Sequence, residues 1–173
     1  MTTVATEHKS DDIVTEEFDV LIVGAGVAGV GGAYHLSTQR PNGSFVVLES
    51  QESFGGTWWS HNYPGIRSDS DLHTYGYKFK PWTGPPIATA EEILKYMGEV
   101  IDENDLASNI RYRHRIESAS WSSEKNKWFI QAELTDTGEK KYFAANFLWM
   151  CQGYYRHSEG YTPDWPEMDS YQG

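Results

Sequence analysis

The sequence contains a single cysteine, Cys151, in 173 residues. A disulfide within the chain is therefore excluded, and a lone thiol is typical of a reducing compartment, so we expect a cytoplasmic protein. Long apolar runs are also missing, because none approaches the roughly 20 residues of a membrane-spanning helix. Met1 is not followed by the basic and then apolar segments of a signal peptide. We therefore expect neither a membrane span nor secretion.

Basic residues are scarce. Lysine and arginine together number 14 against 25 acidic residues, which gives a formal net charge of −11. A nucleic-acid binder needs a basic face for the phosphate backbone, so this balance argues against nucleic acid as a partner. Residues 1–17 alone hold five acidic residues and one lysine, and they predict an acidic disordered tail.

Two catalytic patterns are missing as well. No metal-ligand spacing such as i,i+4 links the six histidines, which are His8, His35, His61, His73, His114 and His157. We therefore assign no metal site. The G-x-S-x-G turn of many hydrolases is absent too, so nothing supports a nucleophilic serine.

The chain is long enough for one domain, and its 16 glycines are more than a plain core needs. Residues 18–23 are a short apolar run that stops at Gly24 and predicts a buried strand. A helical pattern of apolar residues follows and ends before a turn at 41–43, and residues 45–48 predict a second buried strand. This order predicts one βαβ unit with a right-handed crossover.

The turn of this unit carries the glycine pattern Gly24-x-Gly26-x-x-Gly29. The first glycine permits a tight turn, the second lets a pyrophosphate approach the backbone, and the third lets helix and strand pack closely. Free N–H groups at the helix start suit phosphate. Glu49, at the end of the second strand, is placed to accept hydrogen bonds from a ribose diol. The motif therefore predicts NAD or FAD rather than a 2′-phosphorylated dinucleotide.

Residues 50–88 predict a long loop, and loops of this length inside a domain are usually functional. Thr89 and Glu92 have the spacing of a capping box and predict the start of a helix. The strands expected after it span residues 110–116, 119–121, 128–134, 142–144 and 147–150. The middle three predict a small antiparallel meander, and the last predicts a buried strand.

Three stretches of the sequence resemble one family. They are Gly55-Gly-Thr-Trp58, Tyr63-Pro-Gly-Ile-Arg-Ser-Asp69 and Cys151-Gln-Gly-Tyr-Tyr155. Together they resemble the class B flavoprotein monooxygenases, which comprise the flavin-containing and Baeyer–Villiger monooxygenases. The likeness is strongest to the actinobacterial branch that includes the ethionamide-activating enzyme, and it extends over residues 18–173.

The resemblance implies an α/β fold of the FAD/NAD(P)-binding Rossmann-like type, in three β-β-α layers. On this interpretation residues 18–173 form a partial FAD-binding domain, with the antiparallel meander at about 117–145. Members of the family run to several hundred residues, and only one G-x-G-x-x-G pattern occurs here. We therefore expect an incomplete fold that a downstream chain completes.

The resemblance also implies site residues. Those expected to hold the FAD pyrophosphate are Gly24, Gly26, Ala28 and Gly29. Those expected beside the flavin are Gly56, Thr57, Trp58, Arg67, Ser68, Asp69 and Tyr75, of which Asp69 is the candidate catalytic residue. Glu49 is expected on the ribose, the Arg115–Ile116 backbone on the adenine, and Cys151 and Gly153 against the first βαβ turn.

Each of these residues also has a plainer interpretation. Trp58 suits ordinary aromatic packing under a long loop. Arg67 and Asp69 suit a surface ion pair. Cys151 follows a buried strand and suits a small buried residue better than a nucleophile.

The resemblance implies FAD and NADPH as cofactors, with most of the NADPH site outside this chain. It implies a reaction in which O2 and reduced flavin form a C4a-(hydro)peroxyflavin. This species oxygenates ketones in the Baeyer–Villiger manner, or sulfur and nitrogen compounds. The expected partners are therefore O2 and a small ketone, thioether or amine.

The sequence leaves two alternative functions. One is a non-catalytic, truncated nucleotide-binding fragment that is inactive alone. We expect the isolated chain to lack turnover in either case. The other is an NAD-dependent dehydrogenase domain, which is disfavoured because it would not explain the stretches at 55–58 and 63–69.

Overall fold

A computed structural model describes residues 15–172 and shows a six-stranded sheet in the order β3-β2-β1-β6-β5-β4. The strands are β1 (Thr15–Val23), β2 (Phe45–Leu48), β3 (Ile110–Arg111), β4 (His114–Ser122), β5 (Lys127–Leu134) and β6 (Lys140–Met150). The helices are α1 (Val27–Gln39), α2 (Thr57–Ser60), α3 (Leu72–Tyr75) and α4 (Ala90–Glu103). Two short 3-10 turns lie at Ala107–Asn109 and Met168–Ser170.

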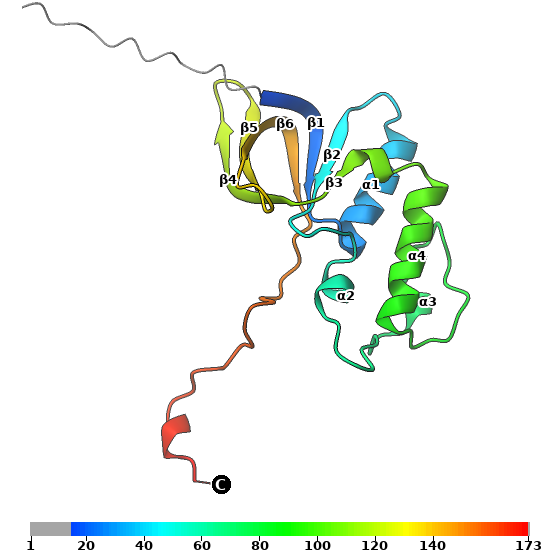
Figure 1. The fold of residues 1–173 in the computed structure, drawn as a ribbon, viewed down its shortest axis with the longest axis vertical. Helices are drawn as coiled ribbons and strands as arrows, with labels where there is room; N and C mark the ends of the chain where they lie inside the picture. Colours follow the sequence, from blue (N-terminus) through cyan, green and yellow to red (C-terminus); the bar gives the residue numbers. More distant parts are fainter. Residues whose placement is uncertain (1–14, 173) are drawn as a thin grey trace, which may run out of the picture.

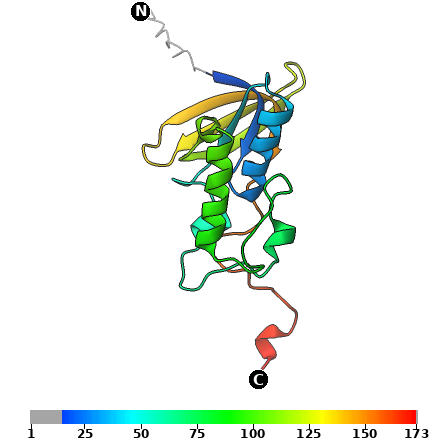
Figure 2. The ribbon, with the colours of Figure 1, turned by 90° about the vertical axis from the view of Figure 1, so that its right-hand side faces the viewer.

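The first half of the sheet is parallel. β1 lies between β2 and β6 and runs parallel to both, and β3 extends the sheet beyond β2. Figures 1 and 2 show α1 and α4 side by side on one face of this half. The core between helices and sheet includes Ile22, Val30 and Met97, all fully buried. The predicted βαβ unit is confirmed, with β2 at the expected residues.

The helix α4 begins as the sequence predicts. The Thr89 hydroxyl accepts a hydrogen bond from the Glu92 N–H at 3.3 Å, and the Glu92 carboxylate accepts one from the Thr89 N–H at 2.8 Å. Two N–H groups that the first turn leaves free are thereby satisfied. The buried side chains of Ile93, Met97 and Val100 hold α4 on the core.

The second half of the sheet is antiparallel, with β5 between β4 and β6. In Figure 1 these strands curve over the face of β1 and β2 that the helices leave uncovered. A second core fills the space between, and its buried residues are Leu21, Val46, Leu48, Ile130, Ala132, Phe143 and Ala145. The three layers are thus helices, parallel sheet and meander, and the predicted fold class is confirmed.

Arg113 divides the strand predicted at 110–116 into β3 and β4. It adopts a left-handed backbone conformation with φ of 62°. Its N–H donates to the Gln51 carbonyl at 2.8 Å, and the His114 N–H donates to the Glu49 carbonyl at 2.7 Å. The chain therefore leaves β2 at this point and pairs with β5 instead.

β6 joins two segments that the sequence pattern separates, at 142–144 and 147–150. The register with β1 keeps one offset along the whole of β6, and the Asn146 amide donates to the Asp19 carboxylate at 3.1 Å. Ala145 and Leu148 both face the second core, although they are three positions apart. The apolar alternation is therefore not strict along β6, and one continuous strand looks like two in the sequence.

The expected tail at 1–17 lies outside the described residues as far as position 14. Residues 15–17 differ from expectation, because they form the start of β1 and pair with β6. The Arg111 guanidinium donates to both oxygens of the Glu16 carboxylate at 2.7 and 2.8 Å, and Lys127 bonds to Glu17. The hydrogen bonds from Arg111 lower the pKa of Glu16 below its usual value. Ion pairs with Arg111 and Lys127, both distant in the sequence, thus stabilise Glu16 and Glu17 at the start of β1.

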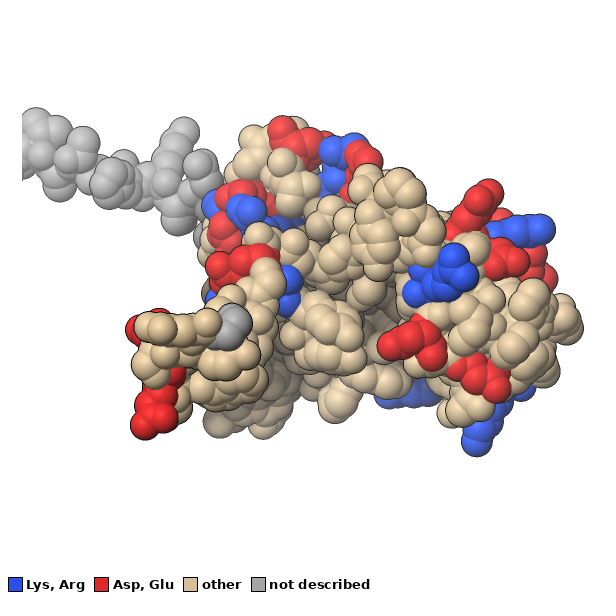
Figure 3. All heavy atoms as spheres, turned by 90° about the horizontal axis from the view of Figure 1, so that it is seen from below, with Lys and Arg blue, Asp and Glu red and all other residues tan. Residues whose placement is uncertain are grey.

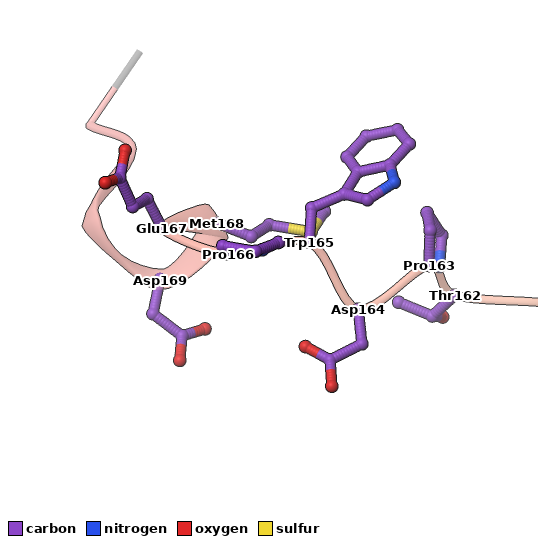
Figure 4. Close-up of a pocket in the computed structure, with 8 residues that line it drawn as sticks. All are labelled: Thr162, Pro163, Asp164, Trp165, Pro166, Glu167, Met168 and Asp169. Atoms are coloured by element: carbon purple, nitrogen blue, oxygen red, sulfur yellow. The ribbon is translucent and has the colours of Figure 1, made fainter.

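Beyond β6 the chain extends away from the sheet to the turn at Met168–Ser170 (Figure 1). Residues 162–169 curve around a shallow hollow (Figure 4). All of its lining comes from this one exposed segment, so the fold itself does not build it. Among residues 15–172, no helix has both the length and the apolar character needed to cross a membrane.

Candidate functional site

The predicted site lies where β1, β2 and β6 end. Gly24, Glu49 and Cys151 each follow the last residue of one of these parallel strands. The chain leaves β1 toward β2 on one side, while β6 lies on the other, so this is a topological switch point. Seen from this end in Figure 3, charged side chains lie mainly toward the periphery. Ligands of open α/β sheets bind at such positions.

Two of the predicted glycines are required by close backbone contacts. Gly24 has φ of 97°, and a Cβ there would lie 2.7 Å from the Cys151 carbonyl oxygen. A Cβ at Gly29 would lie 1.8 Å from the Gly24 carbonyl oxygen. Both positions therefore exclude any side chain, and they fix how α1 leaves β1.

A second glycine turn faces the first. The Gly55 N–H donates to the Ala25 carbonyl at 3.0 Å. Gly56 has φ of 56°, and a Cβ there would lie 3.1 Å from the Gly26 Cα. Gly26 precedes α1 and gives the helix no side-chain cap, and Ala28 is exposed in the first turn. The two turns thus present bare backbone and helix N–H groups, which suit an anion.

Glu49 is buried, with only 6% of its surface exposed. One carboxylate oxygen accepts a hydrogen bond from the Ala25 N–H at 2.7 Å. The other accepts from the Gln51 N–H at 2.8 Å and from the Ser50 hydroxyl at 3.2 Å. A carboxylate accepts about four hydrogen bonds, so roughly one acceptor position remains for a ligand. Glu49 therefore also fastens the glycine turn to β2.

The structure brings Trp58 and Tyr75 together, since the Trp58 indole N–H donates to the Tyr75 hydroxyl at 3.4 Å. Trp58 is half-buried and packs against the first core, as its plainer interpretation predicts. Thr57 is the first residue of α2, next to Gly56. A surface groove lined by Trp58, Trp59 and Leu94 lies between α2 and α4.

The predicted loop residues separate into one buried and two exposed. Ser68 is buried, donates to the Ser70 carbonyl at 2.9 Å and accepts from the Ser70 N–H at 3.0 Å. Arg67 and Asp69 are exposed and, within residues 15–172, form no ion pair with each other. The surface ion pair considered for them is therefore not formed.

The segment after β6 approaches this loop. The hydrogen bond between the Tyr154 and Tyr155 hydroxyls chiefly raises the pKa of Tyr155, and the negative charge of Asp69 adds to the effect. The rings of His157 and His61 are 3.1 Å apart at their nearest nitrogens. Asp69 is therefore an exposed residue of the loop, on the side that the segment after β6 approaches.

The predicted adenine contact lies at the start of β4, one residue beyond the contact between His114 and Glu49. The Arg115 side chain crosses to β5 and donates to Glu133 at 2.6 Å. Ile116 packs on the second core. Both side chains are thus engaged within the fold, which leaves the backbone for any ligand contact.

Cys151 continues the sheet, because its N–H donates to the Val23 carbonyl at 2.9 Å. Burial raises the pKa of its thiol, which opposes nucleophilic use. Gly153 has φ of 75° with open space around it, so its backbone conformation alone favours glycine. Cys151 and Gln152 lie against Gly24, and Gly153 is the next residue along the chain.

Sequence reasoning missed Tyr77. Its hydroxyl donates to the Val27 carbonyl in the first turn of α1 at 2.7 Å, and a Cβ at Gly31 would lie 3.0 Å from its ring. Its N–H donates to the Tyr96 hydroxyl at 2.8 Å, and its ring stacks on Phe79. Burial strongly raises the pKa of its hydroxyl. The glycine at position 31, directly in the helix, is the sequence signal for this contact.

Fold and site together define a nucleotide-binding Rossmann-like domain. The sequence profile of the Thi4 family matches residues 2–63, which include the βαβ unit. The FAD-containing monooxygenase EthA of Mycolicibacterium smegmatis is 45% identical over 161 residues, 92% of this chain and 32% of the relative. A probable FAD-binding monooxygenase, AlmA of Acinetobacter sp., is 46% identical over 91% of this chain and 32% of its own length.

Solved structures agree with these relatives. A steroid monooxygenase bound to NADP matches 88% of this chain and 29% of its own, with 30% identity and a TM-score of 0.72. Cyclohexanone monooxygenase in its closed form matches 91% of this chain and 29% of its own, with 25% identity and a TM-score of 0.73. The chain is therefore homologous to the FAD-containing monooxygenases and spans about a third (32%) of the curated relatives' length.

Proposed function

We propose that this chain is the FAD-binding N-terminal part of an NADPH- and O2-dependent monooxygenase. The observation that carries the proposal is the switch point, where two glycine turns and the buried Glu49 meet. The family proposed is the one its relatives belong to, and their names state FAD as their cofactor. The proposed substrates are small ketones, or sulfur and nitrogen compounds, with O2.

The residues present fit the FAD pyrophosphate and ribose. The turns at Gly26 and Gly56 form a cradle that a larger side chain would fill, since even a Cβ on Gly56 would lie 3.1 Å from the Gly26 Cα. The first turn of α1 has no side-chain cap and no acidic residue, so its positive end is free for phosphate. Glu49 retains one acceptor position for a ribose hydroxyl.

FAD, when bound, supplies the redox chemistry of the family. The part left to these residues is binding and orientation. The backbone of the glycine turns holds the pyrophosphate, and Glu49 orients the ribose. Trp58 and Tyr75, joined by their hydrogen bond, form one wall beside the cradle. Asp69 is the proposed catalytic residue, because its exposed carboxylate is not committed to any ion pair within residues 15–172.

The proposal is tested by titrating the purified chain with FAD and following the quenching of flavin fluorescence. We expect saturable binding. Gly26→Ala should weaken it at least tenfold without unfolding the chain, because a Cβ there lies 3.7 Å from the nearest atom, the Gly56 Cα, and points into the cradle. Gly160→Ala, in open space on the extended segment, is the matched control and should leave the affinity unchanged.

Equal affinity for FAD in Gly26→Ala and the unchanged chain would refute the site. NADPH oxidation should be absent for the isolated chain, with or without a ketone or thioether. Binding without turnover is also what the non-catalytic alternative predicts. Joining this chain to the remaining part of the M. smegmatis relative separates the two functions, since only a catalytic FAD domain would then support NADPH- and O2-dependent oxygenation.

A further inference from the structure

His61 and His157 meet at the surface although they are 96 residues apart. The His61 Nε2 and the His157 Nδ1 lie 3.1 Å from each other, and the two rings are inclined at 60°. His157 is exposed and His61 is partly exposed, so solvent reaches both. We name these two residues the histidine pair. No sequence spacing pattern links residues this distant, so only the fold brings them together.

One member of the histidine pair is held by the fold. His61 directly follows α2, and its N–H donates to the Thr57 carbonyl at 3.1 Å. Its ring lies edge-on to Tyr63, with the ring centroids 6.3 Å apart. The same side chain borders the groove between α2 and α4. The position of this imidazole is therefore set by α2, which the second glycine turn begins.

The other member lies on the segment after β6. His157 is in a turn where the Arg156 guanidinium and the Glu159 carboxylate form an ion pair at 2.8 Å. The ring of Tyr155 lies 6.4 Å from the ring of His157. Glu159 balances the charge of Arg156 next to His157, which reduces the repulsion of an approaching cation.

The facing nitrogens have nearly the separation of two ligands on one metal ion. Zn²⁺ binds imidazole nitrogen at about 2.0–2.1 Å, so two such nitrogens at a tetrahedral angle lie roughly 3.3–3.4 Å apart. The 3.1 Å between the two histidines is close to this distance. Imidazole suits Zn²⁺, Cu²⁺ and Ni²⁺, whereas Mg²⁺ and Ca²⁺ prefer oxygen ligands. The histidine pair is therefore matched to a transition metal in both distance and donor type.

We infer that the histidine pair binds a divalent transition-metal ion, with Zn²⁺ as the expected ion, and thereby ties the segment after β6 to the end of α2. Within residues 15–172, no third histidine, cysteine, aspartate or glutamate completes a metal-binding group with them. Water would therefore fill the remaining positions around Zn²⁺. Such a site is open to solvent and exchanges its ion. This inference does not require that FAD binds.

The test titrates Zn²⁺ into the purified chain, without a histidine tag, by isothermal calorimetry. We expect His61→Ala and His157→Ala each to weaken binding roughly tenfold or more, since loss of a group that only orients a ligand already costs about 10–100-fold. His35→Ala is the matched control. That histidine is also exposed, but its ring bonds to the Gln39 amide at 3.1 Å, and its loss should leave the affinity unchanged.

A second measurement locates the ion on the segment after β6. Trypsin cuts after arginine, and the Arg156 side chain is 82% exposed. A segment tied down at His157 enters a protease less readily than a free one. We expect Zn²⁺ to slow the cut after Arg156 severalfold in the unchanged chain and in His35→Ala. In His61→Ala the cut should keep its rate, although the residues around the cut site are unaltered.

Three results would overturn the inference. Equal Zn²⁺ affinity in His61→Ala, His157→Ala and the unchanged chain would place the ion elsewhere. Displacement of Zn²⁺ by excess Mg²⁺ would assign the binding to carboxylates. Equal protection from trypsin in His61→Ala and the unchanged chain would show that the segment is not tied to α2. Circular dichroism checks that the variants fold, and His61→Gln takes the place of His61→Ala if alanine disturbs α2.

Discussion

The two glycine turns and the loop from Tyr63 to Tyr75 contain the most distinctive stretches of the sequence, but the structure holds them differently. The first turn bonds to β2 through the Gly24 N–H and the Leu48 carbonyl, and the second turn bonds to the first through the Gly55 N–H and the Ala25 carbonyl. Glu49 also bonds to the first turn.

The loop is bonded to residues 86–90 through backbone groups of Ile66, Ser68 and Leu72, and Ser68 and Leu72 are buried. Arg67 and Asp69 are exposed, and the Arg67 side chain has only a 3.3 Å bond to the Gly65 carbonyl.

The turns and the loop therefore differ in what determines their conformation and in how they can contribute to a site. The turns are determined by sterics, since a side chain at Gly24 or Gly29 would collide with main-chain atoms. In the loop, the exposed side chains of Arg67 and Asp69 are free to meet a ligand or another segment. We therefore expect nucleotide binding to depend on this chain alone, and flavin-side chemistry to depend on what covers the loop.

Gly29→Ala should have the largest effect. The new Cβ would lie 1.8 Å from the Gly24 carbonyl oxygen, so the turn must open. We expect the free energy of unfolding to fall by about 3 kcal/mol, at the upper end for overpacking. Urea denaturation followed by circular dichroism measures this. Gly26→Ala is the control from the same motif, and an equal loss in both variants would contradict the steric explanation.

Glu49→Gln should come next. The amide keeps one acceptor oxygen, so one of the bonds from the Ala25 and Gln51 N–H groups is lost in a buried place. We expect a loss of about 2 kcal/mol, because a buried donor without a partner costs about 1–3 kcal/mol. FAD affinity should fall with it. Glu52→Gln, at an exposed ion pair with Arg113, should change neither quantity appreciably.

Tyr77→Phe tests the hydrogen bond that joins the segment just after the loop to the first turn of α1. It removes the hydroxyl that donates to the Val27 carbonyl at 2.7 Å, and we expect a loss of about 1 kcal/mol. Tyr34→Phe is the control. The ring centroids of Tyr34 and Phe79 are 3.5 Å apart, and the Tyr34 hydroxyl has no hydrogen-bond partner within residues 15–172. Thermal unfolding of both variants should separate them, and identical Tm values would show that the link contributes nothing.

Asp69→Ala should have the smallest effect on stability, within about 0.5 kcal/mol, because surface changes away from special features are usually neutral. Asp71→Ala, two positions later, should cost about 1 kcal/mol, since the Asp71 carboxylate caps α3 by accepting from the His73 N–H at 2.8 Å. Equal losses in urea denaturation would mean that Asp69 is structural. In a fusion of this chain to the remaining part of the M. smegmatis relative, Asp69→Ala should instead lower oxygenation of the substrate.

The sequence predicted the local parts of the fold well. The spacing of Gly24, Gly26 and Gly29 identified the βαβ turn, and the pair Thr89 and Glu92 marked the start of α4. These features depend on residues within a few positions of one another. Their physical causes, a tight turn and a helix cap, can therefore be read without knowing the partners.

What the sequence did not predict depends on distant partners. Glu16 belongs to β1 because Arg111, 95 residues away, binds its carboxylate. β6 was divided in the prediction because Ala145 and Leu148, three positions apart, both face the second core. Tyr77 was missed because its hydrogen bond reaches Val27, 50 residues earlier. The roles of Arg67, Asp69 and Arg115 toward a ligand stay predictions.

The long interval between β1 and β6 has a consequence for how the chain is made. Asp19 and Asn146 are 127 residues apart. At about 5–20 residues per second, the ribosome needs roughly 6–25 s to synthesise the interval. The central strand can pair with β2 early, but its other side stays open for that time, with Glu16, Glu17 and Asp19 as its only charged protection. The end of β6, which borders the site, can therefore form only after Met150 has been synthesised.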